Sequence, residues 1–445
     1  MIMTLERIIE RGLELGLEAV EVYANTSECN TIKLDEGNLE SYNIKEIFSV
    51  SIRALKDGKM AYVNSESLDD DAIESVLNSL VKNVNALDAT EPEFMYEGGS
   101  TYVTVPEVKS DYKDHTTGEK IAMLKKMESE ALAKSDKIVK IGYCQYSETS
   151  QKSTLMNSKG LNLSREMSYT STFLGALAAE NGQTALGFSG DINLAFNDIE
   201  CDRIVEESTE SALSQLGAGS IETGKYPVVF KRDVASEILS AFSSVFLGDS
   251  ALRKMTLLTD KIGTKVFGDN ITIVDDPFSD VALIKYPFDD EGVPCRTKNV
   301  VENGVFCGFL NTLKTANFLK AEPTGNGFKA GGTGSITASP TNLYLKEGSL
   351  TKDEIIATVE NGIYVTEVNG LHAGLNPISG AFNVQASGFV IKDGKLDRPI
   401  TLFVVSGNFY EMMNDVTEIG NDIEKRFVGV ASPTIKIGTL TISGK

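Results

Sequence analysis

The sequence predicts an α+β fold in two domains, a mixed α/β N-terminal domain over residues 1–220 and a β-rich C-terminal domain over residues 221–445. Segments with helical periodicity alternate with strand-like runs in the first half of the chain. The second half is richer in short strand patterns and turn signals than in helices. A Gly-Ala-Gly-Ser run at residues 217–220 follows a helical pattern over residues 199–216, and we place the domain boundary there.

Helices are expected where apolar residues recur every three or four positions behind a capping residue. Thr4 is placed to cap a first helix that ends near Gly16. A second helix is predicted over residues 73–84, behind three aspartates that suit the positive end of the helix dipole. Two capping boxes, each with a Glu three residues after a Thr, predict further helices that begin after Thr116 and Thr351.

Antiparallel strands are expected on either side of short turns. Strand patterns over residues 49–55 and 60–64 flank an Asp-Gly turn at residues 56–59. Residues 163–169 alternate small, polar and apolar side chains without helical period, which predicts a long antiparallel strand. Asn-Gly and Asp-Gly pairs predict three more hairpins, at residues 181–182, 303–304 and 393–394.

Composition excludes several classes of protein. The chain of 445 residues has a net charge of −21 and no dense run of Lys and Arg, so we expect no direct contact with nucleic acid. No apolar stretch approaches the ~20 residues needed to span a bilayer. The N-terminus lacks a signal-peptide pattern, and the five cysteines are odd in number and widely spaced. We therefore expect a cytoplasmic protein with reduced thiols and no membrane contact.

Four loop segments in the C-terminal half occur together in an order and spacing that resembles a known family. They are residues 288–294 (Phe-Asp-Asp-Glu-Gly-Val-Pro), 323–327 (Pro-Thr-Gly-Asn-Gly), 374–380 (Gly-Leu-Asn-Pro-Ile-Ser-Gly) and 419–422 (Ile-Gly-Asn-Asp). The set resembles the TldD/PmbA family, some of whose members are labelled modulators of DNA gyrase. The resemblance implies two homologous kinds of subunit, of which only the TldD kind carries a zinc-binding HExxxH helix.

The helix that would carry the zinc motif is predicted over about residues 233–247, but it lacks the ligands. Counting back from the Gly-Asp landmark that begins at Gly248, the HExxxH positions fall on Leu239, Ser240 and Ser244. Zinc prefers imidazole nitrogen, thiolate or carboxylate, and a peptidase needs a carboxylate to take a proton from metal-bound water. The chain has two histidines in all, and neither has a Glu beside it or a second His nearby. We therefore expect no catalytic and no metal-binding residue in this chain.

Five carboxylates lie close together in the C-terminal half and suit Ca²⁺, Mg²⁺ or acid/base chemistry by residue type. They are Asp275, Asp276, Asp289, Asp290 and Glu291. Because they lack EF-hand spacing, we interpret them as two surface turns in an acidic protein. The glycine-rich loop over residues 324–334 lacks the Gly-Lys-Ser/Thr ending of a phosphate-binding P-loop.

The resemblance implies a PmbA/TldE-like component of a TldD/TldE-type metallopeptidase, with zinc supplied by a TldD-like partner. That family places equivalent loops near its peptide-binding cleft. The residues of this chain that we expect near such a cleft are Asp290, Glu291, Gly292, Thr324, Gly325, Asn326 and His372.

Two alternatives remain open from the sequence. One is a homodimeric, non-catalytic protein that binds peptides or serves in regulation. The other is a peptidase with an unrecognised site. The expected partners are a TldD-like subunit or a second copy of the chain, together with a peptide or unfolded polypeptide.

Overall fold

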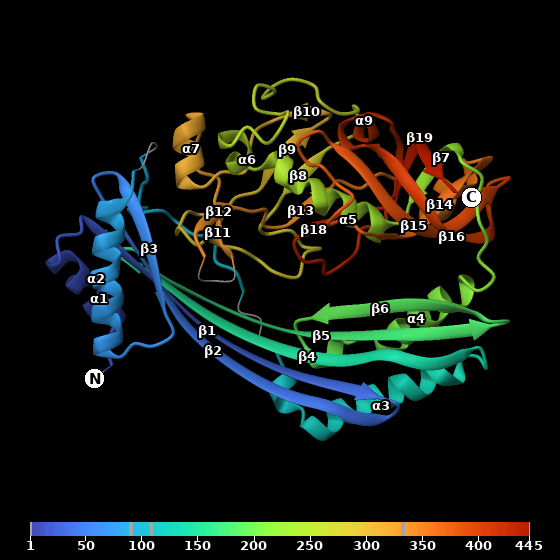
Figure 1. The fold of residues 1–445 in the computed structure, drawn as a ribbon, viewed down its shortest axis with the longest axis horizontal. Coiled ribbons are helices and arrows are strands. Elements are labelled where there is room, and N and C mark those ends of the chain that lie inside the picture. Colours follow the sequence, from blue (N-terminus) through green and yellow to red (C-terminus); the bar gives the residue numbers. More distant parts are fainter. Residues whose placement is uncertain (1, 89–91, 107–109, 331–333, 445) are drawn as a thin grey trace.

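The computed structural model describes residues 2–88, 92–106, 110–330 and 334–444. Its first sheet is antiparallel and has six strands in the order β3-β2-β1-β4-β5-β6. The strands are β1 Ala19–Asp35, β2 Asn38–Lys56, β3 Lys59–Ser65, β4 Ile138–Asn157, β5 Asn162–Glu180 and β6 Gln183–Asn193. Figure 1 shows this sheet as a long curved layer beneath the C-terminal half of the chain.

The hairpins form where the sequence predicts them. Asp57 and Gly58 both have positive φ, 50° and 70°, and they join β2 to β3. Asn181 and Gly182 have φ values of 50° and 79° and join β5 to β6. A tight turn that matches the right-handed twist of two strands needs positive φ at both central residues, which Asn, Asp and Gly tolerate best. The predicted turns at residues 303–304 and 393–394 are confirmed in the same way.

Four helices cover the first sheet in two pairs (Figure 1). Helices α1 (Leu5–Glu14) and α2 (Asp70–Ala86) bury their apolar sides with the β1–β2 end of the sheet, around Val22 and Ile52. Helices α3 (Thr117–Ala133) and α4 (Cys201–Ser214) bury theirs at the other end, around Leu124 and Leu174.

The predicted caps of these helices are confirmed. The Thr4 hydroxyl accepts a hydrogen bond from the Arg7 N–H, and Thr116 forms a complete capping box with Glu119. These bonds satisfy backbone donors that the first turn of a helix leaves unpaired.

The C-terminal half contains two larger sheets and one small ribbon. One sheet has the order β10-β9-β8-β13-β18, the other the order β16-β15-β14-β7-β19-β17, and β11 pairs with β12. Because β16 also pairs with β19, the second sheet closes on itself. The strands are β7 Gly224–Phe230, β8 Ile273–Asp275, β9 Lys298–Glu302, β10 Val305–Phe306, β11 Gly327–Lys329, β12 Ile336–Ala338, β13 Leu343–Leu345, β14 Asn361–Asn369, β15 Ala381–Lys392, β16 Lys395–Asn408, β17 Val416–Ile419, β18 Val430–Ala431 and β19 Ile435–Ser443.

Short helices connect these strands and complete the core. They are α5 Arg232–Phe242, α6 Gly248–Leu252, α7 Leu313–Leu319, α8 Lys352–Ala357 and α9 Phe409–Asn414, with 3-10 turns η1 Tyr112–Asp114, η2 Phe196–Asp198 and η3 Ser243–Phe246. The rings of Phe242 and Phe409 stack with centroids 4.6 Å apart, so α5 is fixed against α9 inside the largest apolar cluster. The fold is α+β and sheet-rich, as the sequence predicts. No helix within the described residues is long and apolar enough to cross a membrane.

Candidate functional site

Helix α5 and the 3-10 turn η3 carry the positions to which the family resemblance assigns a zinc motif, and the side chains there are apolar or hydroxylic. Leu239 is 4% exposed and borders a small apolar cavity with Phe409 and Met412. Ser240 faces solvent, and its carbonyl accepts a hydrogen bond from the Ser243 hydroxyl at 2.7 Å. The α-helix ends at Phe242 and continues as a 3-10 turn.

These residues do not fit a zinc ion. A leucine side chain has no lone pair, and a neutral serine hydroxyl is a poor ligand beside imidazole, thiolate or carboxylate. Ser244, at the last position of the motif, lies in the 3-10 turn, where the spacing of side chains around the axis differs from that of an α-helix. Within the residues that the structure describes, no three or more His, Cys, Asp or Glu side chains are grouped so that they could hold a metal.

Four of the five carboxylates at the end of β8 and in the loop that follows it are buried, so our interpretation of surface turns is wrong. Asp275 and Asp289 are fully buried, and Asp290 and Glu291 are each 4% exposed. The charged partners of Asp290 and Glu291 lie far away in the sequence, and no local pattern near residue 290 reports them. Only Asp276 retains partial exposure.

Asp289 organises the turn of this loop. Its carboxylate accepts hydrogen bonds from the backbone N–H groups of Glu291, Val293 and Gly327, at 2.9, 2.9 and 2.8 Å. Gly292 completes the turn with φ of +83°, a conformation that favours glycine. The loop is therefore held in one shape from within and is tied to β11.

Asp290 and Glu291 join this loop to the first sheet. The Arg165 guanidinium on β5 donates to the Asp290 carboxylate at 2.6 Å. On β2, the guanidinium of Arg53 lies between two carboxylates, at 2.5 Å from Glu21 and 3.4 Å from Glu291. The motif that points to the family thus acts as the contact between the two halves of the chain.

Burial governs the protonation of this contact. Desolvation raises the pKa of Asp289 well above its usual range, and the nearby charge of Glu291 acts in the same direction. Burial also raises the pKa of Glu291, while the Arg53 charge opposes that rise.

Lys329 of β11 is a third titrating group at this contact, beside Asp289 and Glu291. Burial, with repulsion from Arg53, lowers the pKa of Lys329 to about 8. Its ammonium lies over the rings of Tyr23 and Tyr62, with the nitrogen 5.5 and 5.9 Å from the ring centroids.

Six of the seven residues that we expected near a peptide cleft come together at this contact. Thr324 bonds to the backbone of Asn311, and Asn326 donates to Asp275 at 2.9 Å. Gly325 has φ of +72°, and a Cβ there would lie 2.6 Å from the carbonyl oxygen of Pro294. The group is packed rather than open.

The seventh expected residue, His372, lies apart from this group. It is exposed in the loop that joins β14 to β15. In the part of the chain that the structure describes, no hydrogen bond or ion pair links its ring to the other six.

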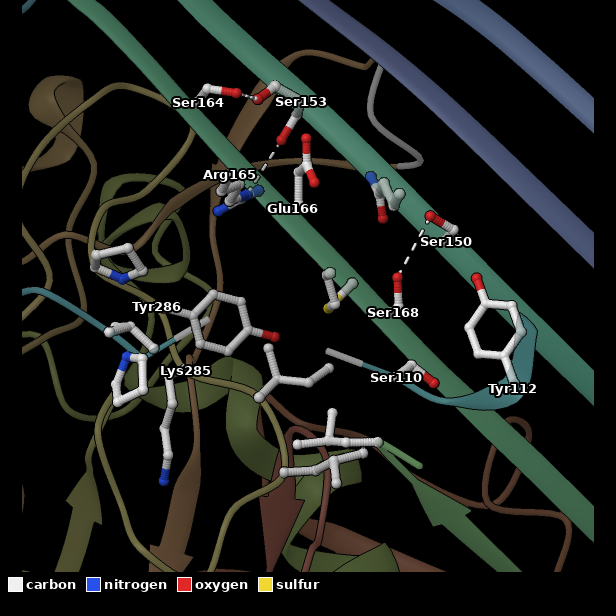
Figure 2. A pocket seen from close by; sticks show the side chains of 18 of the residues that line it. Ser110, Tyr112, Ser150, Ser153, Ser164, Arg165, Glu166, Ser168, Lys285 and Tyr286 are labelled. Atoms are coloured by element: carbon white, nitrogen blue, oxygen red, sulfur yellow. Dashed lines mark hydrogen bonds between the residues drawn. The ribbon is translucent and has the colours of Figure 1, made fainter. Parts of the chain in front are cut away.

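A cavity of about 730 Å³ lies beside this contact, between the first sheet and the C-terminal half (Figure 2). Its lining comes from β4, β5, the segment around Ser110 and residues 283–287. Four of the eight lining residues on these strands are serines: the Ser168 hydroxyl lies 3.4 Å from that of Ser150, and Arg165 Nε donates to Ser153. The volume falls within the range of ligand-binding pockets.

Opposite the strands, Tyr286 contributes a ring and a hydroxyl to the cavity (Figure 2). Burial raises the pKa of Tyr286, so its hydroxyl stays neutral near pH 7 and is available as a donor. The Ser110 hydroxyl also lines the cavity and is buried without a hydrogen-bond partner among the described residues. A bound group with an acceptor would satisfy it.

Sequence reasoning missed this cavity. The serines on β5 appear in the sequence as the polar half of an alternating strand, which is the pattern of any solvent-facing sheet. The available signal was the density of small hydroxyl residues on both β4 and β5. Their enclosure depends on residues 283–287, more than a hundred positions away.

Most of the chain is similar in sequence to a known protein family. Three family models match in sequence: PmbA/TldA metallopeptidase domain 1 over residues 20–84, the central domain over 111–216 and the C-terminal domain over 223–444. A protein named "Metalloprotease" from Methanothermobacter thermautotrophicus is 25% identical over 437 residues, which cover 96% of this chain and 93% of that protein.

Two crystal structures have the same fold. TM0727 from Thermotoga maritima, which carries a DNA gyrase modulator name, is 28% identical with a TM-score of 0.90, and the match covers 98% of this chain and 99% of that one. TldE from Thermococcus kodakarensis is 22% identical with a TM-score of 0.89, covering 99% and 100%. The three domain models and these matches show that the chain belongs to the PmbA/TldD metallopeptidase family.

Proposed function

We propose that this chain is the PmbA/TldE-like, metal-free component of a two-subunit peptidase, in which a TldD-like partner supplies the catalytic zinc. The observation that carries the proposal is the set of side chains on α5 and the 3-10 turn η3 that follows it. By the count back from Gly248, Leu239, Ser240 and Ser244 occupy the positions that the resemblance assigns to HExxxH, and none of them is a zinc ligand. The helix itself is retained, packed by Phe242 into the core.

In this proposal the chain contributes a surface that holds unfolded polypeptide. The cavity beside Arg165 offers hydroxyl groups, which exchange hydrogen bonds with peptide backbone whatever the side chains. The ion pair with Asp290 keeps Arg165 at the cavity wall, because it holds the guanidinium in place. Asp290 is therefore a positioning residue.

The face of the first sheet that carries the Arg165 side chain also offers apolar contacts. Phe173 follows Arg165 by eight positions in β5, so both side chains lie on one face of the sheet. The Phe173 ring stacks on Phe188 of β6 at 5.7 Å, and Phe188 meets Tyr143 of β4 at 5.8 Å. Phe188 is 54% exposed and Leu186 is 59% exposed. Such a surface suits the apolar side chains that an unfolded polypeptide presents.

Zinc analysis and peptide hydrolysis, with and without a TldD-like chain that carries HExxxH, test the proposal. We expect substoichiometric zinc in this chain alone, no hydrolysis by it, and chelator-sensitive hydrolysis when the partner is added. A partner variant with Gln in place of the motif's Glu is the control for activity of the partner's own site. One zinc per purified chain would overturn the proposal. Hydrolysis by this chain alone that survives chelation would favour an unrecognised site.

The proposal also places the protein in the cytoplasm. All five cysteines are unpaired thiols, and Cys307 is exposed. Exposed free thiols are typical of a reducing compartment.

A further inference from the structure

Most of the wall of the 730 Å³ cavity is anchored by hydrogen bonds. Its strand side belongs to the ladder between β4 and β5. On the side of the C-terminal half, the Leu283 N–H donates to the carbonyl oxygen of Phe427 at 2.9 Å. The Asp111 carboxylate accepts from Asn197 Nδ2 at 2.6 Å and so fixes the lining residues next to it in the chain.

One short part of the wall has no such anchors. Val105 and Pro106 line the cavity at the end of an irregular segment over residues 101–106, which we call the flap. Within the residues that the structure describes, no backbone N–H or carbonyl group of the flap takes part in a hydrogen bond. Val103, in the middle of the flap, is 53% exposed.

Tyr102 attaches the flap to the C-terminal half. Its hydroxyl donates to the carbonyl oxygen of Gly292 at 2.8 Å, and its ring meets that of Phe288 edge-on, with centroids 5.7 Å apart. Both partners belong to the loop that Asp289 holds in one shape. Burial raises the pKa of Tyr102 to about 12, so the hydroxyl keeps its proton near pH 7 and remains a donor. Among the described residues, this is the one hydrogen bond that the flap makes.

The chain just before the flap is fixed and then turns through two glycines. Met95 is 4% exposed, and Asn157 Nδ2 donates to the carbonyl oxygen of Tyr96 at 2.8 Å. Gly98 and Gly99 follow with φ of +74° and +81°, and a Cβ at Gly99 would meet nothing within 4 Å. Glycine adopts φ of either sign at little cost, so this pair has the properties of a hinge between fixed and unanchored chain.

We propose that the flap is a movable side of the cavity, with the hydrogen bond from Tyr102 to Gly292 as its latch and the glycine pair at residues 98–99 as its hinge. When the hydroxyl leaves the carbonyl, the two lining residues of the flap move out of the wall. Opening breaks no strand pairing, and it costs one neutral hydrogen bond and one ring contact. These correspond to a factor of roughly 10 to 100 between the closed and open populations.

The latch controls access to the cavity by the size of the guest. Ser168, on the strand side, is itself partly exposed, so a small molecule reaches it while the flap is closed. A bulky guest needs the space that the flap occupies. The rate at which large molecules enter should therefore depend on Tyr102, whereas the rate for small molecules should not.

Thiol labelling of Ser168→Cys in the full chain tests the latch. Iodoacetamide is the small probe and fluorescein maleimide the bulky one, and mass spectrometry of the peptide that carries residue 168 gives each rate. Tyr102→Phe removes the latch hydroxyl and keeps the ring. We expect the bulky probe to react roughly five- to tenfold faster in this variant, because one neutral hydrogen bond is lost.

Tyr226→Phe is the matched control. The Tyr226 hydroxyl also donates to a backbone carbonyl, that of Glu222, at 3.0 Å, but it lies outside the flap. This control should change the rate of the bulky probe less than twofold, and iodoacetamide should react at the same rate in all three proteins. Equal acceleration of both probes in Tyr102→Phe would show a general loosening and overturn the proposal. A bulky probe that is not accelerated would overturn it as well.

Electron paramagnetic resonance of nitroxide labels tests the hinge. A label at Thr104→Cys lies on the flap, and one at Glu97→Cys lies before the glycine pair. Cys29, Cys201 and Cys307 are replaced by serine so that one site is labelled. Loss of the latch hydroxyl should make the label on the flap more mobile and leave the other unchanged. A change at both positions, or at neither, would contradict a hinge at residues 98–99.

This inference goes beyond the proposed peptidase role, because the flap controls access whatever occupies the cavity. The labelling rates need neither zinc nor a TldD-like partner. Failure of the partner-dependent hydrolysis would leave them unchanged, and an immobile flap would leave the zinc content of the chain unchanged. The two proposals therefore fail separately.

Discussion

Arg165 and Asp290 form an ion pair of 2.6 Å between the first sheet and the loop that identifies the family. Asp290 is almost fully buried, and Arg165 also donates to the carbonyl oxygen of Phe288 at 3.2 Å. The pair fixes the position of the C-terminal half over the sheet, and its Arg165 lines the cavity. Its removal should therefore affect stability and binding together.

Arg165→Met should lower the free energy of unfolding by about 3 kcal/mol, because it leaves a buried carboxylate without its counter-charge. Urea unfolding measures this. Lys152→Met is the matched control, since Lys152 pairs with Glu166 on the same two strands while both side chains are more than half exposed. That control should change stability by less than about 1 kcal/mol. Equal losses of unfolding free energy in the two variants would show that the buried pair stabilises the fold no more than the exposed one.

Gly292→Ala should destabilise the chain more than Gly263→Ala. Both glycines have positive φ, +83° and +76°, so both substitutions carry backbone strain of about 1 kcal/mol. A Cβ at Gly292 would lie 2.4 Å from Leu161 Cδ2, whereas nothing lies within 4 Å of a Cβ at Gly263. We expect the packing conflict to add about 1–2 kcal/mol. Thermal unfolding of both variants isolates the packing term, and equal midpoints would contradict it.

Lys329→Met should stabilise the chain below about pH 8 and lose that advantage at higher pH. The folded pKa of Lys329 is about 8, below the usual 10.5, so the folded state pays to keep the lysine charged. Between these values the unfolded chain binds the extra proton, and wild-type stability rises with pH. Methionine carries no charge to bury, so below pH 8 the substitution should raise the free energy of unfolding by an amount on the order of 3 kcal/mol.

The measurement is urea unfolding of both proteins at pH 7 and pH 10. The difference in unfolding free energy should shrink on going to pH 10. Because the Lys329 ammonium is also held over Tyr23 and Tyr62, a difference that stays constant with pH would assign its effect to these ring contacts instead.

Ser168→Trp should weaken the binding of unfolded polypeptide by about tenfold, because the indole fills space in the cavity. Fluorescence anisotropy with a labelled unfolded peptide measures the affinity. Ser79→Trp places the same side chain on the exposed side of α2 and should change affinity less than twofold. If both variants bind like the wild type, the peptide does not occupy this cavity.

Local chemistry explains how much of the fold is predictable from the sequence. The capping bonds of Thr4 and Thr116, and the turns at Asp57 and Asn181, depend on atoms a few residues apart. The apolar spacing of α5 predicts a helix. It does not predict the change to a 3-10 turn at Ser243. No local pattern reports the pairing of β1 with β4, which are separated by more than a hundred residues.

The candidate site shows the limit of the same reasoning. An Asp-Asp-Glu-Gly run has the composition of an exposed turn, and only partners such as Arg53 and Arg165 make its burial possible. Those partners precede the run by more than a hundred residues, where each appears as an ordinary strand residue. The family resemblance selected these six residues, whereas their packed state required three-dimensional contacts.

The double pairing of β1 means that the first two family units cannot be separated. β1 pairs with β2 on one side and with residues 144–157 of β4 on the other, so family domain 1 and the central domain share a single hydrogen-bonded sheet. A fragment that starts after residue 84 would lack β1. The edge of β4 that pairs with β1 would then be exposed and prone to aggregation. Expression trials, chimaeras and gene fusions should therefore keep residues 2–216 together, because the sheet and the helices that cover it, α1 and α4 included, form one folding unit across two sequence modules.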